Sequence, residues 1–192
     1  WSAYLGLTAM VIAAGGFFLF VLVTSWIFGR EFVDGTVKDL LAVPVQRISI
    51  LLAKFIVAVL WSIAATLAIV LTSLLMGVVL HLPGGTAEVI FSKFGLIAVS
   101  AGLSIVVALP FAFIASIGRG YLLPLGLVVL LLMMTNLVAM TGQGDYFPWA
   151  VPGLFVQGKI TMLPVSLILV FLTGAAGIYS TYLWWKFADQ NR

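Results

Sequence analysis

Long stretches without a charged residue alternate with short charged segments along the chain. The uncharged stretches contain 29, 33, 25, 25 and 26 residues and cover positions 1–29, 55–87, 94–118, 120–144 and 160–185. A helix needs about 20 mostly apolar residues to cross a bilayer, so each stretch is long enough. The pattern therefore predicts five membrane-spanning helices, at about residues 4–28, 50–79, 95–117, 121–141 and 163–185.

These stretches do not show the apolar/polar alternation that membrane β-barrels require. Hydrophobic residues make up 64% of the 192 residues and charged residues only 8%, against about 25% charged in an average soluble domain. The expected fold class is an all-α integral membrane protein, a polytopic helical bundle formed by one transmembrane domain over residues 1–192. Pro110 lies inside the third span and is expected to kink it. A soluble enzyme is excluded, and the lack of cysteine excludes disulfides and thiol nucleophiles.

Lysine and arginine are unevenly divided between the two sides that five spans would create. Seven fall on one side and two on the other: Arg30, Lys38, Arg47, Lys54, Arg119, Lys186 and Arg192, against Lys93 and Lys159. Because basic residues are in excess in cytoplasmic loops, the C-terminus is expected in the cytoplasm and Trp1 outside the plasma or inner membrane. A start outside the cell is difficult to insert, so we expect a further span upstream and six in the full chain. The net charge of +3 fits this orientation and does not indicate nucleic-acid binding.

The charged segment 30–47 predicts a short amphipathic helix outside the bilayer core. Thr36 can cap its N-terminus with Asp39 three residues later, and Pro44 would end it. Its apolar stripe consists of Val37, Leu40, Leu41 and Pro44. Two interpretations stay open at this point: a helix lying against lipid headgroups, or a docking element for a cytoplasmic protein.

The residues of this segment resemble a family pattern. In chain order they include Glu31, Gly35 with Thr36, Leu40 with Leu41, Pro44, Arg47 and Lys54. An acid, a Gly-Thr pair, a Leu pair, a Pro-x-x-Arg and a basic residue beginning the next long span are similar to the pattern of type-2 ABC exporter (ABC-2 type) permeases. The bacitracin- and lantibiotic-resistance branch and related multidrug permeases resemble it most. The number of spans and the apolar segment before the last span extend the resemblance along the chain.

The resemblance implies a permease subunit that pairs with a second copy or a close relative and binds a separate cytoplasmic ATPase. ATP and Mg²⁺ would be held by that ATPase, and this chain would hold no cofactor. The segment 30–47 would be the coupling helix. The ATPase contacts implied by the resemblance are Glu31, Gly35, Thr36, Leu40, Leu41, Pro44 and Arg47.

Neither catalytic nor metal-binding residues are expected on this chain, so we do not expect it to be an enzyme. The G-x-x-x-x-G-K-[ST] phosphate-binding motif does not occur in the sequence. His81 is the only histidine and has no carboxylate pair near it, which excludes a metal site. The serines within the spans lack a base that could activate them. Deep charges, which proton relays use, are also missing from the predicted spans.

A substrate path would have to be lined by uncharged polar residues. Thr24 and Ser25 in the first span and Asn136 in the fourth are the candidates, and two copies of the chain could enclose a path between these spans. Asn136 is expected to face protein or a cavity, because an amide facing lipid is costly. Such a path suits an amphipathic substrate, such as a drug, a peptide antibiotic or a lipid-like molecule.

The segment 142–159 is too apolar for a free loop and too short to span, and it predicts a re-entrant or interfacial hairpin at the outer leaflet. Two other functions stay open. A vitamin-binding subunit of an energy-coupling-factor importer would have a similar size, but its polar residues should lie in outer loops. A non-transport membrane assembly protein or membrane enzyme would need a ligand or catalytic cluster.

Overall fold

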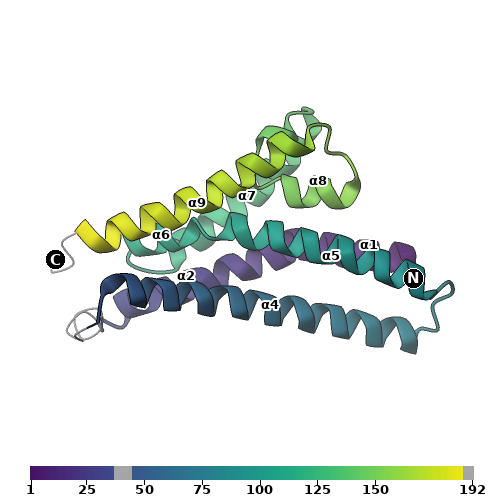
Figure 1. The fold of residues 1–192 in the computed structure, drawn as a ribbon, viewed down its shortest axis with the longest axis horizontal. Helices are drawn as coiled ribbons and strands as arrows, with labels where there is room; N and C mark the ends of the chain where they lie inside the picture. The colour runs from purple at the N-terminus through teal and green to yellow at the C-terminus, as the bar shows by residue number, and fades with distance from the viewer. Residues whose placement is uncertain (37–44, 188–192) are drawn as a thin grey trace.

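The computed structural model describes residues 1–36 and 45–187. Within these ranges the chain forms a bundle of long helices, and the N-terminus and the end of α9 lie at opposite ends of the bundle (Figure 1). The elements are α1 (Ser2–Val11), η1 (Ile12–Gly16), α2 (Phe17–Val33), α4 (Arg47–Val79), α5 (Ala87–Ala108), α6 (Phe111–Ile117), α7 (Leu122–Met140), η2 (Gly144–Tyr146), α8 (Val151–Gln157) and α9 (Leu163–Phe187). Five segments are long and apolar enough to cross a membrane: Ser2–Val33, Arg47–Val79, Ala87–Ile117, Leu122–Met140 and Leu163–Phe187. The predicted all-α, polytopic membrane fold is confirmed.

The first span is longer than its uncharged stretch. It is built from α1, the π-helical segment η1 and α2, and α2 continues to Val33. Arg30 and Glu31, which the sequence analysis assigned to a separate segment, therefore form part of the last helical turn of this span. Likewise, the second span begins at Arg47 rather than near residue 50. Helices continue through charged residues where they leave the apolar core, because a charged side chain is favourable at a wet helix end.

The third span is interrupted as the sequence predicts. α5 ends at Ala108 and α6 begins at Phe111, so the break falls at Leu109 and Pro110. Proline has no N–H and its ring clashes with the preceding turn, which ends the regular hydrogen-bonding pattern. Gly177 of α9 packs directly against this break: a Cβ atom on Gly177 would lie 2.5 Å from Pro110 Cα.

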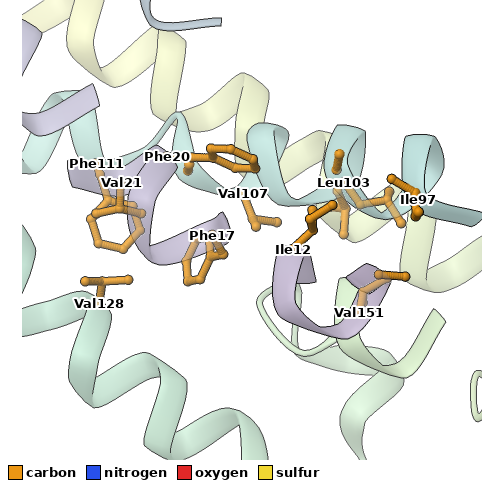
Figure 2. Close-up of a cluster of buried hydrophobic side chains, with 14 of the residues drawn as sticks. Ile12, Phe17, Phe20, Val21, Ile97, Leu103, Val107, Phe111, Val128 and Val151 are labelled. Carbon is orange, nitrogen blue, oxygen red and sulfur yellow. The ribbon is translucent and has the colours of Figure 1, made fainter. Parts of the chain in front are cut away.

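The main apolar core lies where α2, α5 and α6 meet, and Figure 2 shows its central side chains. Phe17 and Phe111 pack edge to face there, with ring centroids 6.0 Å apart. α7 lies at the edge of this core, to which it contributes Val128, and the residues it buries are Pro124 and Val128. Most of the α7 surface is therefore left for lipid or for another protein helix.

Candidate functional site

The end of the bundle where α2 ends and α4 begins carries a concentration of charge. We call it the basic end, because it holds Arg30, Arg47, Lys54, Arg119 and Lys186. The C-terminal end of α9 lies at the same end (Figure 1).

Lys54 joins the two helices that border the connection 34–46. Its side chain projects from the second turn of α4 and is 8% exposed. The Nζ atom donates to Glu31 Oε1 over 2.5 Å and to the Ile27 carbonyl over 2.6 Å, both on α2. A buried ammonium needs such partners, because its removal from water is costly. The pair thus fixes the end of α2 against the beginning of α4.

Aromatic rings cover the Lys54 ammonium. Its Nζ lies 5.6 Å from the centroid of the Phe28 ring and 5.7 Å from that of Trp185. The Phe28 ring packs in turn on Phe55, with centroids 4.8 Å apart. Cation–π contacts of this kind are stronger when they are desolvated. The rings keep water from the ion pair and stabilise its positive member.

Trp185 extends these contacts to the last span and to α6. Its side chain is fully buried, and its carbonyl accepts a hydrogen bond of 2.9 Å from Arg47 Nη1. Its indole Nε1 donates to Ser116 Oγ over 3.0 Å, and that hydroxyl donates to the Ala112 carbonyl. We call Glu31, Arg47, Lys54, Ser116 and Trp185 the Lys54 cluster. It connects α2, α4, α6 and α9 directly beside the connection 34–46.

A second polar arrangement lies at the opposite end, between η2 and α9. The carboxylate of Asp145 accepts hydrogen bonds from the backbone N–H groups of Thr161 and Met162, and also from the hydroxyls of Thr161 and Ser166. Thr161 and Met162 directly precede α9, and Ser166 lies in its first turn. Asp145 therefore fixes the segment 142–159 to the beginning of α9.

The hydrogen bond from the Thr161 side chain is the main cause that lowers the pKa of Asp145 below its ordinary value of 3.8, and the backbone donors act in the same direction. A lowered pKa in the folded state means that the ionised carboxylate contributes stability above pH 3.8. This contribution is lost as the pH falls through the lowered value. Asp145 is the one acidic residue among positions 142–159, and a single carboxylate in so apolar a segment is the sequence signal for such a role.

Replacement of Asp145 by Asn should loosen the attachment of the segment 142–159. The amide offers one acceptor oxygen in place of two, and its own N–H groups would face other donors. We expect a lower melting temperature at pH 7 and faster proteolysis within residues 142–159. The melting temperature of the unmodified chain should also decrease as the pH falls below 3.8, whereas the melting temperature of the variant should not show this decrease. An identical pH profile for the two proteins would contradict the role of the carboxylate.

Trp149, between η2 and α8, contacts the break in the third span. Its indole Nε1 donates to the Val107 carbonyl over 3.1 Å, in the last turn of α5 before the break. Irregular backbone within a membrane protein must find hydrogen-bond partners in the protein. The segment 142–159 thus packs on α5 through Trp149, and its Val151 lies in the main apolar core.

Comparison with known proteins identifies the family. Residues 4–136, more than two thirds of the chain, match the family described as ABC-2 family transporter protein. The chain belongs to this ABC-2 family. It is also 26% identical over 176 residues to the bacitracin transport permease protein BCRB of Bacillus licheniformis, covering 89% of this chain and 84% of that protein. No solved structure matches the chain significantly.

The chain is therefore a multi-pass membrane permease of the ABC-2 type, and its family implies a separate ATPase subunit as partner. This membership does not favour the vitamin-binding subunit or the assembly protein as alternatives.

The structure describes four of the predicted ATPase-contact residues of this ABC-2 permease and places them in two environments. Glu31 and Arg47 point into the Lys54 cluster, where they bond Lys54 and the Trp185 carbonyl. Gly35 and Thr36 lie in an exposed turn, and Gly35 has a positive φ of 70°. The remaining predicted contacts, Leu40, Leu41 and Pro44, lie outside the described residues.

The three predicted path residues of the permease are not brought together. Thr24 and Ser25 are buried inside the chain. Asn136 lies on the exposed face of α7, and its amide donates to the Leu132 carbonyl of its own helix over 3.0 Å. Within the single chain, therefore, Asn136 is not covered by the described residues, and the backbone of its own helix accepts one of its hydrogen bonds.

Proposed function

We propose that this ABC-2 permease is the membrane subunit of an ATP-driven exporter that moves an amphipathic substrate across the cell membrane. A drug, a peptide antibiotic or a lipid-like molecule fits this class. The similarity to a bacitracin transport permease supports the export of an antibiotic-like molecule. ATP and Mg²⁺ belong on the partner ATPase in this proposal, and the chain itself performs no catalysis.

The observation that carries the proposal is the position of the Lys54 cluster. It fixes the α2 end of the connection 34–46 to α4 through Glu31 and Lys54, and the α4 end to α9 and α6 through Arg47 and Trp185. A force applied to this connection by an ATPase would therefore act on several spans together. The ends of the connection serve as anchors in this proposal, and the connection itself provides the docking surface.

Replacement of Leu40 and Leu41 together by Asp should abolish coupling to the ATPase. Burying one such apolar side chain is worth about 1.5–3 kcal/mol, so the loss of two should weaken the complex at least tens-fold. We expect the variant to insert and fold, because neither residue belongs to a predicted span, but to lose substrate-stimulated ATPase activity. Co-purification with the ATPase and transport in vesicles measure the two effects. Unchanged binding and transport would show that the segment only lies on the membrane surface.

The exposed α7 helix supports a second permease copy in the complex. Among its exposed residues are Leu130, Met133, Leu137 and the polar Asn136. An amide is costly in lipid even when one of its bonds is satisfied, and a second chain could supply the other partners. We therefore propose a dimer, with an identical or closely related chain, that encloses the substrate path. Native mass spectrometry of the complex measures this stoichiometry, and one permease per complex would contradict the dimer.

The proposed orientation places the basic end and the C-terminus in the cytoplasm. Gly35 and Gly84 are a matched pair for testing it, because both are exposed, have positive φ and leave open space for a Cβ. They lie in turns at opposite ends of the bundle, and the chain has no native cysteine. A cysteine replacing Gly84 should react with an impermeant thiol reagent on intact cells, and one replacing Gly35 should react after lysis only. The reverse result would invert the proposed orientation.

A further inference from the structure

A groove runs between α2 and α4 at the basic end, beside the Lys54 cluster. Its volume is about 450 Å³, within the range of ligand pockets, and its walls include Trp26, Ile27, Arg30, Glu31, Lys54 and Val57. We call this hollow the α2–α4 groove. A second hollow of about 240 Å³ shares Trp26 and Ile27 with it and continues along the same helices to Trp61. The two hollows together are polar at the helix ends and apolar further into the span.

The polar part of the groove contains both a hydrogen-bond acceptor and hydrogen-bond donors that the described residues do not use. Glu31 Oε2 is buried and has no hydrogen-bond donor among them, whereas Oε1 is bonded to Lys54. The Arg30 side chain is 61% exposed and uses Nε to bond Asp34, so its terminal nitrogens can still donate. A buried carboxylate oxygen without a donor is costly, and a ligand that brings an N–H group would relieve that cost.

The apolar part of the groove suits a hydrocarbon chain. Trp26 is 47% exposed and Trp61 is 61% exposed, although both are large aromatic residues in a membrane span. Trp26 lies one turn before Arg30, where a tryptophan packs its ring on acyl chains and keeps its N–H in the headgroup region, whereas Trp61 lies deeper in the span. Arg30 lies over the Trp26 ring at 5.9 Å, so the guanidinium is held at the level where a headgroup would sit.

We propose that the α2–α4 groove binds a phospholipid with an ethanolamine headgroup. The lipid phosphate accepts hydrogen bonds from Arg30, and the primary ammonium donates to Glu31 Oε2. An acyl chain lies along Trp26 toward Trp61. The chemistry requires an anionic group and an N–H donor on one amphiphile, which a choline headgroup lacks because its nitrogen is fully methylated. This binding site goes beyond the proposed transport function and does not depend on it.

Native mass spectrometry of the full chain with two lipids tests the site. Phosphatidylethanolamine and phosphatidylcholine with identical acyl chains, offered at equal concentration, differ only in the N–H groups. We expect the ethanolamine lipid to be bound at least threefold more than the choline lipid. Replacement of Arg30 by Gln should reduce the binding of both lipids about fivefold, since a basic residue near a lipid phosphate contributes on the order of a fivefold gain.

The variants Trp61→Ala and Ile63→Ala distinguish lipid binding in the groove from lipid binding elsewhere on the surface of α4. Both side chains are exposed, and two positions along an α-helix differ by about 200°, so Ile63 faces away from the groove. Trp61→Ala should lower the occupancy of both lipids and preserve the preference for ethanolamine. Ile63→Ala should bind both as the unmodified chain does.

Equal binding of the two lipids by the unmodified chain would overturn the proposal. So would unchanged binding in both Arg30→Gln and Trp61→Ala. A photoreactive side chain at position 61 gives a further check in membranes, where we expect cross-links to lipid. Cross-links to a second copy or to another protein helix would show that protein, and not lipid, fills the groove. None of these results depends on ATPase binding or transport, so they test the lipid site independently of the proposed export function.

Discussion

Replacement of Lys54 by Met should destabilise the basic end by roughly 2–3 kcal/mol. Removing one member of a buried ion pair leaves the other charge without compensation, which costs about 3–5 kcal/mol when both are fully buried. The Glu31 side chain is 23% exposed, so contact with water lowers the cost of leaving its charge unpaired. We expect a lower melting temperature in detergent and less protein in the membrane.

Two further variants identify the cause of that loss. Lys186→Met removes the same charge from an exposed position at the same end, and it should leave stability unchanged. The double replacement Lys54→Met with Glu31→Leu removes both charges, so it should recover most of the stability lost in Lys54→Met. If the double variant were as unstable as the sum of its single replacements, the pair would not be the source of the effect.

Replacement of Gly177 by Ala should separate α9 from the break in the third span. The new Cβ would lie 2.5 Å from Pro110 Cα and 2.7 Å from Pro110 N, and both are backbone atoms that cannot rotate away. Overpacking of this kind costs about 1–3 kcal/mol, and a contact with backbone atoms belongs at the upper limit. Thermal unfolding should therefore begin at a lower temperature, and the hydrogen bond between Trp185 and Ser116 should weaken as α9 moves from α6.

Gly126→Ala is the matched control for this variant. Gly126 also lies within a membrane-spanning helix, but nothing lies within 4 Å of a Cβ at that position. Alanine favours the helix by about 1 kcal/mol over glycine, so this variant should be as stable as the unmodified chain or slightly more so. Equal effects at positions 126 and 177 would mean that the close approach of α9 to Pro110 does not limit stability.

The charge-free stretches predicted the spans, because the bilayer core excludes charged residues from the middle of a spanning helix. Pro110 predicted the break, because a proline interrupts the helix at its own position whatever the rest of the fold. The bond between Lys54 and Glu31 was not predictable in this way. The residues are 23 positions apart, and their contact requires two helices to pass side by side at one level. The same holds for Asp145, whose partners Thr161 and Ser166 are brought to it by the fold of the intervening hairpin.

The direction in which a polar side chain points also depends on packing. Thr24 and Ser25 occupy adjacent positions, and both are buried because α2 lies in the middle of the bundle. Asn136 is more polar than either and yet is exposed, because α7 lies at the edge. Their chemistry made all three candidates for a substrate path. The polarity of a residue does not indicate which helix becomes the central one.

The π-helical segment η1 changes how the first span should be compared with related sequences. Leu5 and Ala9 are buried at α-helical spacing before it, and Phe17, Phe20 and Thr24 are buried at α-helical spacing after it. Within the segment Ile12, Ala13 and Gly16 are buried, and a π-helix has an i to i+5 hydrogen-bonding period, one residue longer than that of an α-helix. The segment therefore acts as a one-residue insertion that rotates the second half of the helix back onto the core. A relative whose first span is a continuous α-helix would align with this chain only after a gap of one residue between positions 12 and 17.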